Sequence, residues 1–120
     1  PKRVRIYNSA GTETGDWTYS NLQIDKGIAN DGTNIWITGR KMTTANGNIV
    51  QFTPSGVVTG AEVFTASQTN RPYYLAYSPG NFAVSAENNY TFYNYAQTYG
   101  DSTARTDSSG SGQPLFIKLK

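Results

Sequence analysis

Apolar side chains along this chain alternate with polar ones, and they do not recur at the 3.6-residue spacing of an amphipathic helix. β-Branched and aromatic residues fill the alternating stretches, and glycine, asparagine, aspartate and proline separate them. The pattern predicts ten strands, at 3–7, 16–19, 26–30, 34–39, 48–53, 57–64, 73–77, 82–86, 90–97 and 115–120. We therefore expect an all-β chain of short antiparallel hairpins, arranged as propeller-blade-like repeats or as a compact β-sandwich or barrel.

Two predicted strands contain continuous apolar triplets, at 35–37 (Ile-Trp-Ile) and 82–84 (Phe-Ala-Val). A strand with one solvated face would alternate, so the triplets indicate sheets that are covered on both faces. The opposite composition appears at 102–113, which has almost no apolar content and is predicted to be a polar Ser/Gly-rich loop. The chain then divides into a β-repeat domain at 1–101, this loop, and a C-terminal strand at 114–120 that returns to the sheet or to a neighbouring subunit.

The sequence also repeats itself. Residues 28–38 align with residues 75–85, with Ile matching Leu, Ala matching Ala and Thr matching Ser. A second register aligns residues 7–11 with residues 52–56, and both of these segments end in Ser-Gly or Ala-Gly. A fainter third copy lies at 95–100. The repeating unit is an apolar strand, a glycine turn, a buried strand, a gap, and an aromatic strand that ends at a glycine turn.

This unit resembles a β-propeller blade of the NHL or virginiamycin B lyase-like kind. Residues 31–38 (Asp-Gly-Thr-Asn-Ile-Trp-Ile-Thr) are similar to the inner-strand signature of those families, and residues 47–56 (Gly-Asn-Ile-Val-Gln-Phe-Thr-Pro-Ser-Gly) to their third-strand signature. The resemblance covers residues 3–100 and implies about two and a half blades, whereas a closed propeller needs at least about four. It implies either that several chains complete one ring or that the repeats stack in another β-architecture.

The composition removes most catalytic and metal-binding chemistry. The 120 residues include no Cys and no His, which excludes disulfides, zinc clusters, cysteine nucleophiles, Ser-His-Asp triads and the histidine-dependent lyase chemistry of the family named above. The eight Asp and Glu residues are scattered, mostly beside turns. The segment 30–34 (Asn-Asp-Gly-Thr-Asn) has the spaced oxygens of a calcium loop but lacks the distal glutamate, so a hairpin turn explains it better. We expect no enzymatic activity, no cofactor and no metal.

The net charge is +2, but positive charge gathers at the two ends of the sequence. A candidate basic docking stripe consists of Lys2, Arg3, Arg5, Lys118 and Lys120. Without these five residues, five basic side chains remain against eight acidic ones, a balance of −3. The stripe either protects exposed edge strands from wrong pairing or docks an acidic partner. We expect no nucleic-acid partner because no motif supports one, and no membrane insertion because no apolar run approaches about 20 residues.

The nine tyrosines are the most informative group of side chains. Alternation along the predicted strand at 90–97 and beyond it puts Tyr93, Tyr95 and Tyr99 on one face. Tyrosine combines a large apolar ring with a hydroxyl, which suits surfaces that become buried against a partner. The candidate interface residues are Tyr93, Tyr95, Tyr99, Tyr73, Tyr74 and Trp17. The alternatives are that these rings fill the core or that they form a sugar-stacking platform.

Two functions follow as expectations. The first is a non-enzymatic structural or assembly protein, a homo-oligomer located on a virion or an extracellular surface, such as a phage capsid decoration or tail protein that contacts other virion proteins. Its support is compositional: the chain is rich in Thr, Asn, Ser, Gly and Tyr and has basic terminal strands. The second is an oligomeric β-propeller lectin that binds cell-surface carbohydrate.

Overall fold

The computed structural model describes residues 2–23, 25–65, 72–86, 92–96 and 107–108, and within them every element is a β-strand. In chain order the strands are β1 (Lys2–Tyr7), β2 (Glu13–Tyr19), β3 (Leu22–Gln23), β4 (Ile28–Asn30), β5 (Ile35–Lys41), β6 (Gly47–Phe52), β7 (Val58–Phe64), β8 (Pro72–Ser78), β9 (Asn81–Ala86), β10 (Phe92–Ala96) and β11 (Asp107–Ser108). All of their pairings are antiparallel, which confirms the all-β prediction.

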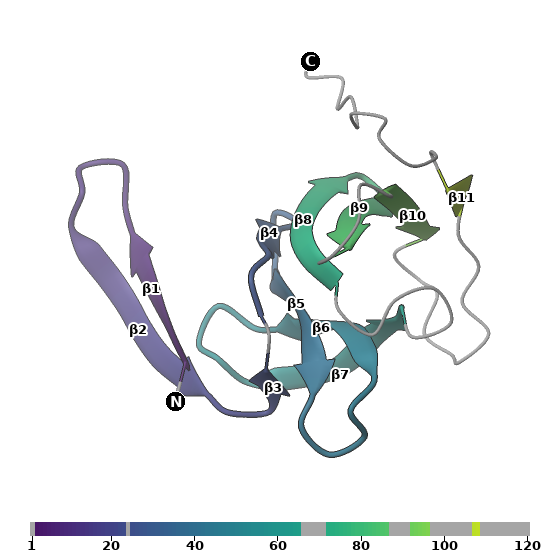
Figure 1. The fold of residues 1–120 in the computed structure, drawn as a ribbon. Coiled ribbons are helices and arrows are strands. Elements are labelled where there is room, and N and C mark those ends of the chain that lie inside the picture. The colour runs from purple at the N-terminus through teal and green to yellow at the C-terminus, as the bar shows by residue number, and fades with distance from the viewer. Residues whose placement is uncertain (1, 24, 66–71, 87–91, 97–106, 109–120) are drawn as a thin grey trace.

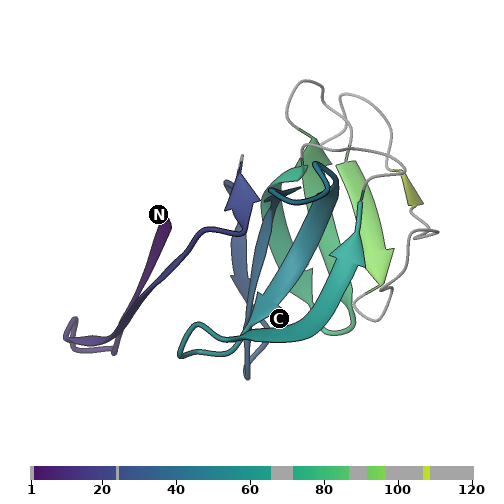
Figure 2. The same ribbon diagram turned by 90° about the horizontal axis from the view of Figure 1, so that it is seen from below.

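The strands form three layers that lie side by side (Figures 1 and 2). The first layer is the hairpin β1–β2. The second is a five-stranded sheet in the order β3-β5-β6-β7, with β4 also paired to β5, and the third is a four-stranded sheet in the order β8-β9-β10-β11. None of the three sheets closes into a barrel in the described part of the chain.

The internal repeat of the sequence has a structural counterpart. In the β4–β5 hairpin Ile28 pairs with Ile37, and in the β8–β9 hairpin Leu75 pairs with Val84, which are the positions 47 residues further on. Each of these hairpins is followed by a third strand, β6 or β10, which pairs with the second strand of the hairpin. A fourth strand, β7 or β11, then pairs with the third. Each sheet therefore contains the same four-stranded antiparallel meander.

The hairpin β1–β2 repeats the outer half of this unit, β6–β7, down to the hydrogen bonds of its turn. The N–H of the first turn residue, Asn8 or Thr53, donates to the carbonyl four residues later at 2.9 or 2.8 Å. The glycine three residues on, Gly11 or Gly56, donates back to that residue at 3.0 or 2.9 Å. Both glycines have positive φ, 82° and 92°, a conformation that glycine adopts at little cost. The described chain thus consists of half a unit followed by two whole units.

Two apolar clusters hold the layers together. The hairpin core lies between β1–β2 and the five-stranded sheet and contains Val4, Leu22, Ile35, Ile37, Val50 and Phe52. The inter-sheet core lies between the five-stranded and four-stranded sheets and contains Trp36, Ile49, Val63, Phe82, Val84 and Tyr95. Both faces of the five-stranded sheet are covered, because successive residues of β5 enter opposite clusters. This confirms what the first apolar triplet predicted.

The second triplet behaves differently, one strand begins earlier than the sequence predicts, and two short strands were not predicted. Phe82 and Val84 enter the inter-sheet core, whereas Ala83 lies on the opposite face and is half-buried. Strand β2 begins at Glu13 rather than at residue 16, because β1 pairs with this polar stretch. Strand β3 was not predicted, and β11 lies inside the predicted loop at 102–113. The predicted strand at 115–120 lies outside the described residues.

Candidate functional site

A groove runs between β1 and the segment that contains β4. Its volume is about 490 Å³. Val4 and Ile6 of β1 form one wall, and Ile28 and Ile35 stand on the other. A second hollow of about 260 Å³ continues it toward Asp25 and shares three lining residues with it. The walls are mainly aliphatic, so the groove is suited to an apolar or extended ligand rather than to a small charged one.

The free edge of β1 lies along this groove. In the described part of the chain β1 pairs with β2 alone, whereas its counterpart β6 pairs with strands on both of its edges. In an antiparallel pair, alternate residues of an edge strand direct their N–H and C=O groups away from the partner. At the rim of the groove, Ile28 and Tyr7 are 55% and 53% exposed. This site therefore offers main-chain hydrogen bonding and apolar contact together.

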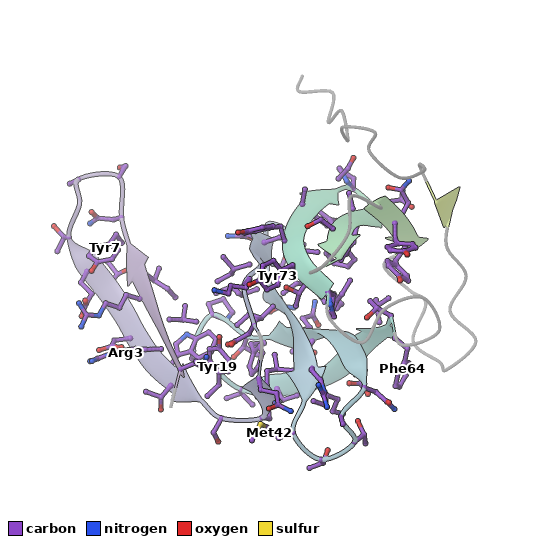
Figure 3. The ribbon with its side chains drawn as sticks, viewed as in Figure 1. Arg3, Tyr7, Tyr19, Met42, Phe64 and Tyr73 are labelled. Atoms are coloured by element: carbon purple, nitrogen blue, oxygen red, sulfur yellow. The ribbon has the colours of Figure 1, made fainter. Side chains whose placement is uncertain are left out.

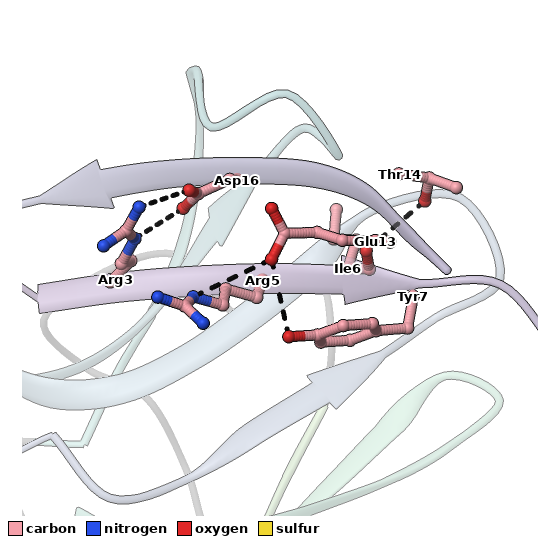
Figure 4. A network of polar contacts seen from close by, with 7 residues as sticks. All are labelled: Arg3, Arg5, Ile6, Tyr7, Glu13, Thr14 and Asp16. Carbon is pink, nitrogen blue, oxygen red and sulfur yellow. Dashed lines mark hydrogen bonds and ion pairs between the residues drawn. The ribbon is translucent and has the colours of Figure 1, made fainter. Parts of the chain in front are cut away.

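The outward face of the hairpin is polar (Figure 4). Arg3 donates to both carboxylate oxygens of Asp16, with Nε 2.7 Å from Oδ1. The hydrogen bond from Arg3, together with its positive charge, lowers the pKa of the Asp16 carboxyl below its usual range. Arg5 Nε lies 3.9 Å from Glu13 Oε1, and the hydroxyl of Tyr7 donates to the same oxygen at 3.4 Å. Two cations and two anions thus neutralise one another on this face.

The predicted basic stripe is placed as follows. Arg3 and Arg5 point outward from β1 and each has an acidic partner. Lys2 lies at the end of β1, and its Nζ is 2.9 Å from Asp25 Oδ1. The carboxylate of Asp25 is almost fully buried and also accepts a hydrogen bond from the hydroxyl of Tyr19. Lys118 and Lys120 lie outside the described residues. Within the described part, β1 is an edge strand with charged residues, as the protective interpretation of the stripe expects.

The candidate interface aromatics fall into two groups. Tyr95 is completely buried in the inter-sheet core, and Tyr93 packs partly buried against it at a ring distance of 6.5 Å. Burial raises the pKa of the Tyr95 hydroxyl. Trp17 is half-buried against Phe52, with ring centroids 5.3 Å apart, and its Nε1 donates to the Pro54 carbonyl at 2.9 Å. These three rings join the layers of the molecule.

The second group lies at the surface of β8. Tyr74 is 61% exposed, and its ring meets that of Tyr73 edge-to-face at 5.2 Å. The Nζ of Lys26 lies 5.4 Å from the centre of the Tyr73 ring, so a cation covers one face of the pair. Figure 3 shows Tyr73 close to the centre of the molecule and Tyr7 at the distal part of the hairpin. Tyr99 lies outside the described residues.

Asp31 has a structural role in the turn between β4 and β5. Its Oδ1 accepts hydrogen bonds from the N–H groups of Thr33 and Asn34, at 2.9 and 2.7 Å. Its Oδ2 accepts from the indole of Trp36 at 2.7 Å and from the amide of Gln51 at 3.2 Å. Desolvation raises the pKa of this carboxyl, but the four hydrogen bonds outweigh it and the net shift is downward. A carboxylate engaged in this way belongs to a hairpin turn, as the sequence indicated, and not to a calcium loop.

The other described carboxylates are also engaged. Glu62 accepts from Lys41 at 3.1 Å, and Asp16, Glu13 and Asp25 have the partners given above. Among the residues that the structure describes, no cluster of three or more Asp and Glu side chains could hold a metal ion. No helix long and apolar enough to cross a membrane occurs in that same part. These five carboxylates therefore each have a partner within the fold.

Comparison with known proteins adds no relative to this picture. No protein-family model matches the chain, and neither a curated protein nor a solved structure matches it. The site must therefore be interpreted from its own geometry. Sequence analysis did not predict the groove, because its two walls come from separate layers. The signal that could have indicated it is the aligned repeat, which makes β1 the equivalent of β6, the third strand of a unit.

Proposed function

We propose that this chain is a non-enzymatic structural module whose role is self-association into a larger assembly, as in a phage virion component such as a capsid decoration or tail protein. The observation that carries the proposal is the aliphatic groove beside the free edge of β1. Such an edge is a ready template for another chain, and its apolar wall gives the contact a driving force. The proposal locates the protein on a virion or an extracellular surface, among copies of itself and other virion proteins.

The repeating unit supports the same proposal. A four-stranded antiparallel meander packed face to face with the next is the form of a propeller blade, and the described chain has two whole units and one half unit. We infer that the units are blade-like repeats related to those of NHL-type propellers. Within the described part of the chain, the edge of β1 beside the aliphatic groove has a physical reason to associate, because its apolar wall is uncovered there.

A test of this function compares matched charge substitutions at two exposed aliphatic residues. Ile28→Asp places a carboxylate in the groove, and Val57→Asp, at a residue that is 61% exposed, places one in the β6–β7 turn. We expect the full chain to be oligomeric by native mass spectrometry and light scattering at micromolar concentration. Ile28→Asp should weaken association at least about tenfold, since burying one aliphatic side chain contributes about 1.5–3 kcal/mol.

The control should leave association unchanged, and both variants should keep the thermal unfolding midpoint of the unchanged protein within a few degrees. A wild-type protein that remains monomeric at micromolar concentration, and at about 100 times that concentration, would contradict the proposed function. Equal weakening by both substitutions would show that charge in general, and not the groove, controls association.

One observation favours the alternative of an oligomeric β-propeller lectin for cell-surface carbohydrate. The exposed ring of Tyr74, beside Tyr73 and Lys26, is a surface on which a sugar ring could stack. Trp17 and Trp36 do not offer such a surface, because the first packs against Phe52 and the second is buried. A glycan array decides this alternative: a signal that Tyr74→Ala removes and Tyr7→Ala retains would support it, and a blank array would exclude it.

A further inference from the structure

We propose that the groove beside β1 is a strand-acceptor site, and that its occupant is the C-terminal segment 114–120 of a second copy of this chain. This inference rests on the proposed function of self-association and specifies its contact. The acceptor consists of the free edge of β1 and the aliphatic side chains that line the groove. The donor is an extended segment that adds one strand to the hairpin, so that β1 gains a second neighbour as β6 has in β5.

The geometry of the repeat defines where the added strand lies. Strand β6 pairs with β5 on one edge and with β7 on the other, and β1 corresponds to β6 because both lead into equivalent turns. A strand on the free edge of β1 would occupy the place that β5 occupies beside β6. In β5, Trp36 faces the following sheet and is buried in the inter-sheet core, as Ile49 of β6 is. The added strand must likewise direct apolar residues into the groove, toward Val4 and Ile28.

The outer face of the hairpin explains why a partner would arrive at the edge. Arg5 and Tyr7 of β1 correspond to Val50 and Phe52 of β6, which are core residues. A polar outer face at the end of a stack is typical of a terminal repeat and does not favour packing of a further sheet against it. The apolar surface of this layer is therefore reached along the edge, through the groove.

The sequence of segment 114–120, Pro-Leu-Phe-Ile-Lys-Leu-Lys, has the pattern that the groove requires. Leu115, Ile117 and Leu119 alternate along one face of an extended strand, and the lysines take the other. None of the other stretches outside the described ranges, 66–71, 87–91, 97–106 and 109–113, alternates in this way.

Charge is compatible with this contact. The lysines of the donor would lie on the outward face, next to Arg3 and Arg5 of the acceptor. Both arginines already have carboxylate partners, Asp16 and Glu13, so the outward face is neutral before the donor arrives. Exposed charges of like sign then cost little, because water and salt screen them. The aliphatic contact and the main-chain hydrogen bonds therefore determine the pairing.

The length of the connection favours a second copy over the same chain. Six residues separate Ser108, the last residue of β11, from Leu115, and an extended chain of this length spans at most about 25 Å. The groove lies on the far side of the five-stranded sheet from the sheet that contains β11 (Figure 1). Crossing two layer spacings of about 10 Å each and passing round a sheet edge needs more chain than this.

The absence of native cysteine allows a clean test by disulfide cross-linking. One full-length variant carries Ile28→Cys, and a second carries Ile117→Cys. When the two are mixed under mild oxidation, we expect a covalent heterodimer at a yield at least about five times that of two matched controls. The first control replaces the acceptor by Val57→Cys, and the second replaces the donor by Phe116→Cys, on the opposite face of the segment.

Leu115→Cys and Leu119→Cys, each mixed with Ile28→Cys, cover a shift of register. Heterodimer yields no higher than those of the controls, for all three donors, would overturn the proposal. A chain that carries both Ile28→Cys and Ile117→Cys and forms only an intramolecular disulfide would overturn it as well. Native mass spectrometry of a chain that lacks residues 114–120 separates this result from the proposed function. If the unchanged protein associates and the shortened chain associates equally well, the acceptor proposal fails while self-association stands. If the unchanged protein is monomeric, the proposed function itself fails.

Discussion

At the scale of single residues, the described side chains of this protein use their charges to fix turns and edges. Asp31 is the best example, because its carboxylate joins the β4–β5 turn to Trp36 in the inter-sheet core and to Gln51 on β6. Gln51 in turn accepts a hydrogen bond from the hydroxyl of Thr59 at 2.7 Å. One acidic side chain thus connects a turn to two further strands. This explains why a residue that sequence analysis assigned to a turn has such an extended network.

We expect Asp31→Asn to lower the free energy of unfolding by about 1–3 kcal/mol at pH 7, because an amide cannot accept from the two backbone N–H groups and from the Trp36 indole at once. The pKa of Asp31 is lower in the folded state, so its contribution is present above the unfolded-state pKa and is lost as the pH falls through the folded-state pKa.

Urea denaturation of the two proteins at pH 7 and at about pH 2 measures this difference, which should shrink in acid. Asp16→Asn is the matched control, since its ion pair with Arg3 is exposed and should contribute much less to the free energy of unfolding. A gap between wild type and Asp31→Asn that stays constant across this pH range would show that the charge of Asp31 does not stabilise the fold.

At the scale of elements, the turns are the most regular parts of the molecule. The β1–β2 and β6–β7 turns share their hydrogen bonds and their positive-φ glycines, yet their surroundings differ. A Cβ on Gly56 would lie 2.5 Å from Cδ2 of Trp17, whereas a Cβ on Gly11 would meet nothing within 4 Å. Gly56 is therefore required both for its positive φ and for the close approach of the Trp17 ring, whereas Gly11 is required for its positive φ alone.

This difference gives a matched pair of substitutions. Gly11→Ala should lower the free energy of unfolding by about 1–2 kcal/mol, the cost of a left-handed conformation for an L-residue. Gly56→Ala should add about 1–3 kcal/mol to this, because the Trp17 ring must move out of the hairpin core. Chemical denaturation measures the stability, and near-UV circular dichroism reports the tryptophan environment. Equal losses for the two variants would contradict the close approach.

The elements also show what could be predicted from the sequence. Alternation and turn residues predicted most strands to within a few positions, because each hairpin is determined by neighbouring residues. Strand β3 was missed because Leu22 and Gln23 form a strand only by pairing with Arg40 and Lys41 of β5. The hairpin register places Arg5 opposite Asp16 and Tyr7 opposite Glu13, so the contact of Arg5 with Glu13 is a diagonal one across the strand pair. The groove could not be predicted from the sequence, since it depends on how Val4 and Ile28 approach from different layers.

At the scale of the whole molecule, the described part is a stack in which the middle sheet shares one core with each neighbour. Val4 belongs to the hairpin core and Val84 to the inter-sheet core, on opposite sides of that sheet. The two clusters share no residue. The four-stranded sheet approaches the segment before β4 closely at Gly27, where an added Cβ would lie 2.7 Å from the Leu75 nitrogen.

Because the cores are separate, truncations in different cores should be additive. Val4→Ala and Val84→Ala should each lower the free energy of unfolding by about 1–3 kcal/mol, and the double variant should lose their sum within about 0.5 kcal/mol. Leu75→Ala with Val84→Ala is the contrasting pair, since these residues are cross-strand partners and should deviate from additivity. If the Val4→Ala/Val84→Ala double variant deviated from additivity as much as the Leu75→Ala/Val84→Ala double variant, the two cores would not be separate.

The order of strand pairing also has a kinetic consequence. Every strand pair in the described part except β3–β5 joins strands that are adjacent in the chain. Hairpins of this kind close within about 1–10 μs. The slow event is then the docking of the preformed sheets against one another. During synthesis, each of these hairpins can therefore form as soon as its own second strand has emerged.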